Sequence, residues 1–352
     1  MRKAAAIVLG LASLSALAPA AAQEAISFAG KTVTMIIPSA PGGGTDTTGR
    51  AIASFLVDHL PGKPALIYRN IPGANGMTAL NFFVRQVERD GLTMTMGSSS
   101  QADPVHYRVP QAFYNPATFE IIGGAGRGGT VLMINKEAVP RLSDTKAKPV
   151  VMGSLVGIPR SGMLSTAWGI EFLGWNATWV VGYKGTNDLM LALERGEVDM
   201  TSTGNMFQIN KLLSSSKFQV LSQSGSLENG KFVGREDFGD APLFHQRMEG
   251  RIKDTIAAKA FTYWSNLTAI DKWLALPEKT SPAIVEAYRE AFRRAVKDPG
   301  LLEKGKTLSE DFEPMSHEDV RALIVGLNDT PMEAINYINV MLRKQGLDPG
   351  GK

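Results

Sequence analysis

A turn rich in glycine, with the order Pro41-Gly42-Gly43-Gly44-Thr45-Asp46, stands between a predicted strand and a predicted helix. Glycine has no Cβ atom, so the backbone of such a turn can approach a ligand closely. The first amides of a helix have no partner inside the helix, and the helix dipole adds to their preference for an anion. The turn therefore predicts a binding site for a small anion such as a carboxylate.

Asp46 carries a negative charge in this turn, and a carboxylate there repels an anion. We expect Asp46 to fix the loop rather than to contact the ligand. The alternative is that the turn binds nothing and that Asp46 only stabilises the start of its own helix. The residue pattern by itself leaves both interpretations open.

The flanking sequence predicts the elements that hold this turn. Apolar, β-rich residues at 32–37 end at Pro38, and apolar residues from Ala51 to Leu60 then follow helical spacing. After a second strand and helix, the strand predicted at 92–96 runs into Ser98, Ser99, Ser100 and Gln101. Alternating strands and helices are typical of a parallel sheet with crossover helices.

The alternation repeats in the middle of the chain, with strands predicted at 150–155, 178–181 and 198–201 and helices at 163–173 and 187–194. The last of these strands runs into Thr203, Gly204 and Asn205. The last hundred residues are mainly helical, with amphipathic segments at 282–297 and 317–326. We therefore predict an α/β protein with two mostly parallel sheets, flanked by helices, and a helical C-terminal section.

Two matches to nucleotide-binding motifs fail on their context. Residues Gly300 to Thr307 fit the P-loop expression, but a helix precedes them where the motif needs a strand, so we interpret them as a connection between helices. Residues Gly124 to Gly129 fit GxGxxG, but a strand is predicted after them where the motif needs a helix. We interpret this second segment as a flexible crossing between two domains.

Nothing else in the sequence nominates an enzyme. The histidines, His59, His106, His245 and His317, have no metal-ligand spacing, and we expect solvated or capping roles for them. There is no GxSxG nucleophile motif, and no pair of acids stands out. The sequence predicts neither a cofactor nor a metal.

The first residues resemble an export signal. Arg2 and Lys3 precede an apolar run from Ala4 to Leu17, which Pro19 breaks before three alanines, so cleavage is expected after Ala22. The run is shorter than the roughly 20 residues of a membrane anchor, which is the alternative. There are 0 cysteines, so no lipidated cysteine tethers the chain. The sequence predicts a mature protein that is soluble in the periplasm.

The net charge excludes some classes of binding partner, and the length indicates the number of domains. Removal of residues 1–22 takes away two basic residues and no acidic one, so the formal net charge falls from +3 to +1. This balance indicates neither nucleic acid nor an anionic membrane as the partner. The rest of the chain is too long for one ordinary core and predicts two domains.

Four segments, in order, resemble the periplasmic receptors of tripartite tricarboxylate transporters, the Bug family. They read IIPSAPGGGTDTTGRAIASFL, YRNIPGANGMTAL, DGLTMTMGSSSQADP and VVGYKGTNDLMLALERGEVDM. The resemblance implies a two-lobed periplasmic-binding-protein fold (type II) that closes on a small mono-, di- or tricarboxylate, a monomer, and membrane permease subunits as partners. It also implies that lobe 1 comprises residues 23–125 and 221–352, and lobe 2 residues 126–220.

In this family, facing strand-to-helix loops hold the ligand largely through backbone amides. Carried over by segment, the resemblance implies ligand contacts by Pro41 to Asp46 and by Ser98 to Gln101 in lobe 1. In lobe 2 it implies contacts at Gly157, Pro159, Arg160 and Ser161 and at the strand end from Thr203 to Asn205.

The chain also departs from the family pattern. The loop from Gly157 to Gly162 lacks the histidine that the family often has there, and Arg160 either clamps a second carboxylate or is a solvated surface arginine. Residues 227–265 match poorly and have no predicted place, while Trp168, Trp175 and Trp179 are predicted in the core of lobe 2. The ligand is therefore not named by the sequence, and a sensor with the same fold, or an exported enzyme, remains an alternative to a transport receptor.

Overall fold

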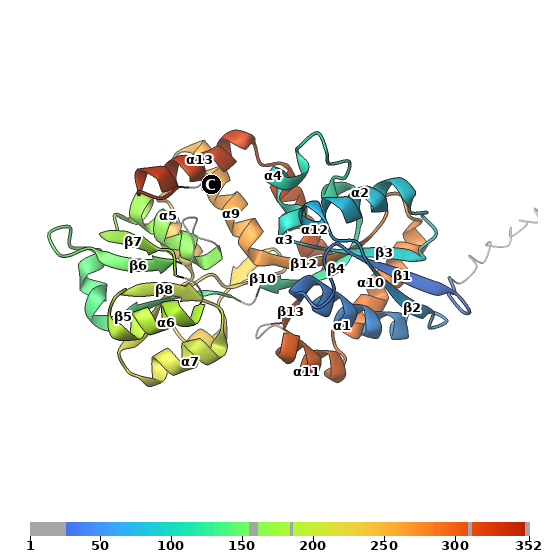
Figure 1. The fold of residues 1–352 in the computed structure, drawn as a ribbon, viewed down its shortest axis with the longest axis horizontal. Coiled ribbons are helices and arrows are strands. Elements are labelled where there is room, and N and C mark those ends of the chain that lie inside the picture. The colour runs from blue at the N-terminus through green and yellow to red at the C-terminus, as the bar shows by residue number, and fades with distance from the viewer. Residues whose placement is uncertain (1–25, 128, 155–160, 184–185, 309–311, 349–352) are drawn as a thin grey trace, which may run out of the picture.

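The computed structural model describes residues 26–127, 129–154, 161–183, 186–308 and 312–348. The predicted export signal lies outside these residues, as do Gly157, Pro159 and Arg160. The described chain forms two lobes side by side, each built on its own sheet with helices against it (Figure 1). This confirms the predicted two-lobed α/β fold.

Lobe 1 contains a sheet of 6 strands in the order β13-β4-β12-β3-β1-β2. Its strands are β1 (Thr32–Ile37), β2 (Ala65–Asn70), β3 (Thr93–Ser98), β4 (Glu120–Arg127), β12 (Ile270–Leu276) and β13 (Phe312–Met315). Its helices are α1 (Gly44–His59), α2 (Met77–Gln86), α3 (Ser99–Ala102), α4 (Pro104–Tyr107), α10 (Pro282–Ala295), α11 (Pro299–Leu308) and α12 (His317–Asn328). Apolar residues of α1 and α10 pack on the same core as the buried residues of β1 and β3.

Lobe 2 contains a sheet of 5 strands in the order β7-β6-β8-β5-β9. Its strands are β5 (Val131–Asn135), β6 (Val150–Ser154), β7 (Ala177–Val181), β8 (Met200–Thr203) and β9 (Phe218–Gln223). Its helices are α5 (Leu164–Leu173), α6 (Thr186–Arg195) and α7 (Met206–Ser214). By strand membership, the chain crosses between the lobes after β4 and again after β9, while the domain bounds at 125 and 221 remain a prediction.

Within this confirmed fold class, the sheets are mixed rather than mostly parallel as predicted. In lobe 1, β1 runs parallel to β2 and β3, but β12 runs antiparallel to both β3 and β4. In lobe 2, β5 runs antiparallel to β8 and β9. The antiparallel strands β5 and β12 are the first strands of each sheet after a crossing. Each begins at the edge where the parallel strands of that sheet end, so it runs in the opposite direction. Because β12 is buried almost throughout, its residues do not alternate, and no period marks it in the sequence.

The segment 227–265, which had no predicted place, forms the junction between the lobes. It contains most of the hairpin of β10 (Ser226–Glu228) and β11 (Lys231–Val233), then α8 (Phe244–Met248) and most of α9 (Thr255–Ala269). Helix α9 and the C-terminal helix α13 (Met332–Lys344) lie across the junction in Figure 1. One buried core includes residues of α5 from lobe 2 together with residues of α8, α9 and α13.

Tryptophan side chains contribute to this junction rather than to the core of lobe 2 alone. Trp168 is fully buried, with its ring centroid 5.2 Å from that of Phe261 and 6.3 Å from that of Tyr337. Trp179 donates from Nε1 to Oε1 of Gln345 at 3.2 Å. Aromatic pairs of this kind contribute about 0.5–1.5 kcal/mol each beyond their burial. Trp168 is therefore a core residue, as predicted, but this core is shared with helices α9 and α13 rather than formed by lobe 2 alone.

The two rejected motifs are both regular secondary structure. Residues Gly300 to Thr307 lie inside helix α11, which follows α10, so the predicted connection is itself a helix. Residues Gly124 to Gly126 belong to strand β4. A Cβ atom on Gly124 would lie 2.4 Å from the carbonyl oxygen of Lys272, so this glycine serves close strand packing.

Candidate functional site

The predicted ligand loops lie on both sides of the first crossing between the lobes. In lobe 1, Ser98 and Ala125 both pair with Lys272, which places the carboxyl end of β3 beside the end of β4. Strand β1 is parallel to β3, so the glycine turn lies at the same edge. In lobe 2, Thr203 at the end of β8 pairs with Val131, the first residue of β5 after the crossing. The two sets of loops therefore flank the junction.

The glycine turn presents the start of helix α1 to solvent. Gly43 is the N-cap residue, and Gly42, Gly43 and Gly44 are exposed. The Thr47 hydroxyl donates to the carbonyl oxygens of Gly43 at 3.2 Å and Gly44 at 3.3 Å. Among the described residues, no acceptor is bonded to the amides of Gly44 or Thr45. These amides therefore remain available to a ligand.

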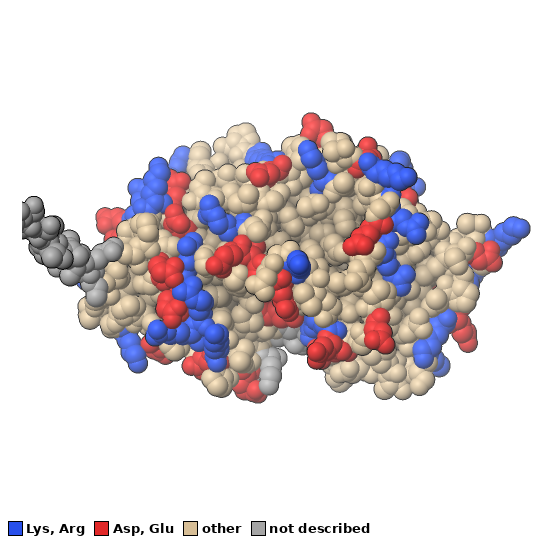
Figure 2. Space-filling view, turned by 180° about the vertical axis from the view of Figure 1, so that it is seen from behind, with Lys and Arg blue, Asp and Glu red and all other residues tan. Residues whose placement is uncertain are grey.

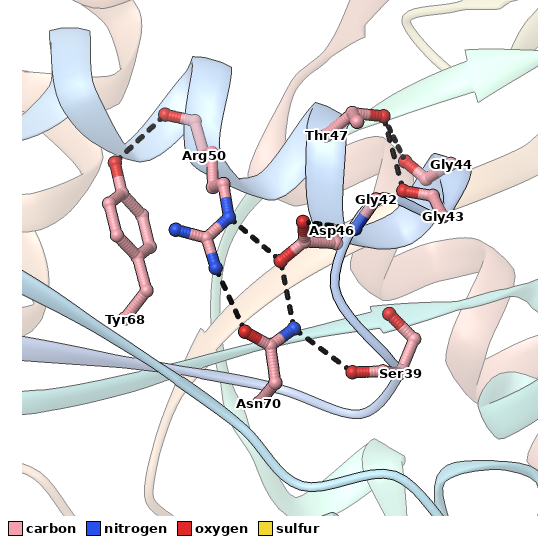
Figure 3. A network of polar contacts seen from close by, with 9 residues as sticks. All are labelled: Ser39, Gly42, Gly43, Gly44, Asp46, Thr47, Arg50, Tyr68 and Asn70. Atoms are coloured by element: carbon pink, nitrogen blue, oxygen red, sulfur yellow. Dashed lines mark hydrogen bonds and ion pairs between the residues drawn. The ribbon is translucent and has the colours of Figure 1, made fainter.

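Asp46 is buried and fixes the turn, in agreement with the expected role (Figure 3). Its carboxylate accepts from the Gly42 amide, from Nε of Arg50 and from Nδ2 of Asn70, each at 2.8 Å. Burial raises the pKa of this carboxyl, but the hydrogen bonds from Gly42, Asn70 and Arg50 outweigh it, so the pKa lies below its ordinary value. The negative charge of Asp46 is thus compensated inside lobe 1.

Arg50 completes this network from the next turn of α1. Its Nη2 donates to Oδ1 of Asn70 at 2.9 Å, and its guanidinium lies over the ring of Tyr68, 4.4 Å from the centroid. The Tyr68 hydroxyl in turn donates to the Arg50 carbonyl oxygen at 3.0 Å. Arg50 is four residues after Asp46, which is helical spacing, but its contacts with Asn70 and Tyr68 depend on the pairing of β1 with β2.

Ser39, at the carboxyl end of β1, is a candidate that the sequence did not single out. Asn70 Nδ2 donates to the Ser39 carbonyl oxygen at 3.0 Å, which holds the strand end against β2. The Ser39 hydroxyl oxygen is buried and has no hydrogen-bond partner within the described part of the chain. It lies close to the start of α1 in Figure 3. A hydroxyl in this position can donate to a ligand that the free amides hold.

The serine-rich segment after β3 has a mainly internal hydrogen-bond pattern. Gln101 Oε1 accepts from the Ser98 amide at 2.8 Å and from the Ser98 hydroxyl at 2.9 Å. Gln101 Nε2 donates to the Asn75 carbonyl oxygen at 2.6 Å. Gln101 therefore ties two loops of lobe 1 together, while Ser100 is partly exposed at the same edge. Ligand contacts by Ser98, Ser99, Ser100 and Gln101 remain a prediction.

In lobe 2, Thr203 and Asn205 shape the start of helix α7. The Asn205 side chain caps the helix by accepting from the Gln208 amide at 2.8 Å. Thr203 Oγ1 donates to Oε1 of Gln208 at 2.8 Å and accepts from the Asn205 amide at 3.1 Å. Gly204 lies between them and is partly exposed. The strand end is therefore held by local hydrogen bonds, without the charges that hold lobe 1.

A cluster of hydroxyl groups from distant segments lies beside this strand end. The Ser224 hydroxyl accepts from the Thr130 amide at 2.9 Å, and the hydroxyls of these two residues are 3.4 Å apart. Ser202 and Ser222 line the same small cavity of about 10 Å³, and the Ser222 hydroxyl is buried without a partner among the described residues. The residues belong to β8 and β9 or directly adjoin β5 and β9, so no short motif could have indicated them.

His245 is a further departure from the sequence-based expectation of a solvated or capping role. Its ring lies in the junction, stacked 4.0 Å from the ring centroid of Phe232, and burial lowers its pKa to about 4. Its Nε2 is 2.9 Å from the Ser265 hydroxyl oxygen. That hydroxyl also bonds the Phe261 carbonyl oxygen at 2.9 Å, and the adjoining cavity is only about 10 Å³. The pair therefore lacks the room and the free hydroxyl of a hydrolytic site.

Comparisons with known proteins agree with the fold. No family model matches the chain. A UPF0065 protein of Bordetella pertussis is 24% identical over 303 residues, which cover 83% of this chain and 85% of that protein. A TctC solute-binding protein from Polaromonas superposes with a TM-score of 0.65 at 18% identity, over 89% of this chain and 98% of the other.

The periplasmic binding protein BugD superposes with a TM-score of 0.50 at 21% identity, over 90% of this chain and 98% of the other. The chain thus has the fold of TctC and BugD, and the resemblance to Bug-type receptors seen in its sequence is confirmed. In the described ranges, no helix has both the length and the apolar composition that crossing a membrane requires.

Proposed function

We propose that this protein is a periplasmic receptor that captures a small organic acid between its lobes. The observation that carries the proposal is the start of α1, where exposed glycines leave the amides of Gly44 and Thr45 free while Asp46 is compensated from within. Hydrogen bonds from such donors to an ionised group contribute roughly 1.5–3 kcal/mol each. The similarity to solute-binding proteins supports the same function.

The two lobes divide the work of recognition. The free amides of lobe 1 hold a carboxylate, and the buried Ser39 hydroxyl adds a donor beside them. The hydroxyl groups at the strand ends of lobe 2 contact the rest of the ligand when the lobes close. Hinge closure of two lobes around a ligand is an established mode of domain motion.

The proposed function also involves a cellular compartment and a membrane partner. The predicted export signal directs the chain to the periplasm. There it acts as a soluble monomer and delivers its ligand to the membrane permease subunits of a tripartite transporter. It performs no chemistry on the ligand and needs no cofactor. The face seen in Figure 2 carries Lys and Arg interspersed with Asp and Glu, without the single-sign surface typical of nucleic-acid binding.

Thermal denaturation of the mature protein with a panel of mono-, di- and tricarboxylates tests this function. A ligand that binds only the folded state stabilises it by about 2.7 kcal/mol at a concentration 100 times its Kd, so the Tm rises with concentration. If no carboxylate raises the Tm and a neutral sugar or peptide does, the proposal is wrong.

Two variants then place the ligand on the glycine turn. Gly43 has φ −78°, and a Cβ atom there would contact only the Ala40 carbonyl oxygen at 3.7 Å, so Gly43→Val should fold. It should weaken carboxylate binding at least tenfold in calorimetry because it obstructs the turn. Thr45→Val keeps the backbone amide and nearly the same volume, and it should bind within about threefold of the parent.

A further inference from the structure

A second hollow, separate from the predicted ligand loops, lies on lobe 2 beside the edge strand β9. Its volume is about 850 Å³, within the usual range for small-molecule sites. None of the residues that line it belongs to the glycine turn, to the segment after β3 or to the end of β8. Nothing in the proposed transport function requires this hollow.

The edge of β9 in the hollow is already covered by its own chain. The Gln223 amide donates to the Pro242 carbonyl oxygen at 3.0 Å, and Arg247 Nη2 donates to the Leu221 carbonyl oxygen at 2.8 Å. These bonds occupy backbone groups that an added strand would need. The hollow therefore suits a compact molecule better than an extended peptide.

Arg247 brings an uncompensated positive charge into the wall of the hollow. It makes no ion pair with a carboxylate of any described residue, and its Nε is buried without a hydrogen-bond partner there. Burial lowers the pKa of Arg247, since its charged form is partly removed from water. Of the acids in the wall, Asp237 is paired with Arg235 at 2.8 Å and Asp240 is exposed. The remaining basic residue, Lys136, is also exposed.

Apolar side chains form much of the rest of the wall. Leu142, Phe218 and Phe238 are buried, and Val139, Leu173 and Trp175 lie beside them. A guanidinium binds a carboxylate through two parallel hydrogen bonds, and apolar walls favour an aliphatic or aromatic body. We propose that this hollow binds an amphipathic organic anion, with its charged group at Arg247 and its apolar part along Trp175 and Phe218.

Octanoate, with octanamide as its neutral counterpart, is a direct probe. Each is titrated into the mature protein by calorimetry, in parent and Gly43→Val forms, because Gly43→Val obstructs the proposed ligand turn in lobe 1. We expect octanoate to bind both forms with similar affinity and octanamide to bind at least tenfold more weakly. Absence of octanoate binding, its loss in Gly43→Val, or equal affinity for octanamide would each overturn the proposal.

Variants in the wall locate the charge. Arg247→Gln should weaken octanoate at least tenfold and bring its affinity close to that of octanamide. Arg195→Gln removes the same charge from an exposed site of lobe 2 outside the hollow and should leave binding unchanged. Ser143→Trp fills the exposed rim of the hollow and keeps Arg247. It therefore tests whether octanoate binds in the hollow if Arg247→Gln does not fold. Undiminished octanoate binding by Ser143→Trp and by folded Arg247→Gln contradicts the proposed site.

Discussion

The two walls that flank the junction are built differently. In lobe 1, the charged and amide side chains of Asp46, Arg50 and Asn70 bond to one another, and the backbone amides at the start of α1 are left free. In lobe 2, neutral hydroxyl groups cluster near the strand ends, and that of Ser222 lacks a partner among the described residues. Under the proposed function, lobe 1 provides a rigid, general anion site, and lobe 2 provides the donors whose arrangement selects among organic acids.

The largest expected effect comes from breaking the support of the lobe 1 wall. Asp46→Ala leaves the Gly42 amide and the Asn70 and Arg50 side chains without their acceptor, so the free energy of unfolding should fall by about 2–4 kcal/mol. Carboxylate affinity should fall at least tenfold because the turn is no longer fixed. Urea denaturation and calorimetry measure the two effects.

Asp199→Ala is the matched control in lobe 2. Asp199 accepts from the Val151 amide at 2.9 Å and pairs with Arg141, but it precedes β8 and so lies at the opposite end from Thr203. The Asp199→Ala variant should lose about as much free energy of unfolding as Asp46→Ala, but it should keep the carboxylate affinity of the parent. Equal loss of affinity in both variants would mean that the affinity depends on stability alone, not on the glycine turn.

His245 in the junction makes the free energy of unfolding depend on pH. The pKa of His245 is lowered to about 4 in the folded state, so the unfolded chain binds its proton first as the pH falls. Stability from this group is therefore complete above pH 6.5 and is lost between pH 6.5 and about 4, by roughly 2–3 kcal/mol. His245→Phe should flatten the unfolding free energy over this interval. An unchanged slope would show that other groups determine it.

Asp46 also contributes stability that is lost as the pH falls, but over a lower pH interval than His245. Its pKa is depressed below its ordinary value of 3.8, so its contribution is complete well above pH 3.8 and is lost as the pH falls through the folded-state pKa. Asp46→Asn should lose stability at neutral pH and show a shallower decline below pH 4. A decline as steep as that of the parent would contradict the role of the ionised carboxylate.

Thr203→Val tests the lobe 2 wall with a smaller expected effect. It removes the hydrogen bonds to Gln208 and from the Asn205 amide, which should cost about 1 kcal/mol of stability. The effect is smaller than that of Asp46→Ala because no charge is left unpaired. Urea denaturation gives the cost, and a loss above about 3 kcal/mol would show that the lobe 2 wall is as strongly tied as that of lobe 1.

The smallest change in stability is expected for Ser222→Ala. The hydroxyl is buried without a partner among the described residues, so its removal breaks no hydrogen bond and should not lower the unfolding free energy. Carboxylate selectivity, measured as a ratio of Kd values for two ligands, should nevertheless change severalfold. An unchanged ratio would remove Ser222 from the account of selectivity.

The lobe 1 turn was predictable because its signals are local. Pro38 ends a strand, the glycines open the turn, and the spacing from Ala51 to Leu60 marks the helix, so the turn and the role of Asp46 follow from one short segment. Its partner Asn70 was not predictable, since the contact depends on the parallel pairing of β1 with β2.

The lobe 2 wall and the junction were not predictable for the same reason. Thr130 and Ser224 are far apart in sequence and meet only because β5 and β9 are neighbours. Strand β12 was missed because burial on both faces removes the alternation that marks a strand. The packing of Trp168 against Phe261 joins helices that no local pattern relates.

The central claim is that backbone amides at the start of α1 hold the ligand, and NMR tests it directly. In a protein labelled with ¹⁵N at glycine, the signals of Gly42, Gly43 and Gly44 are assigned by single substitutions. The protein is titrated with the carboxylate that gives the largest rise in Tm. The Gly44 amide proton should shift downfield saturably, with the Kd found by calorimetry. Saturable binding that leaves the Gly43 and Gly44 signals in place would contradict the account.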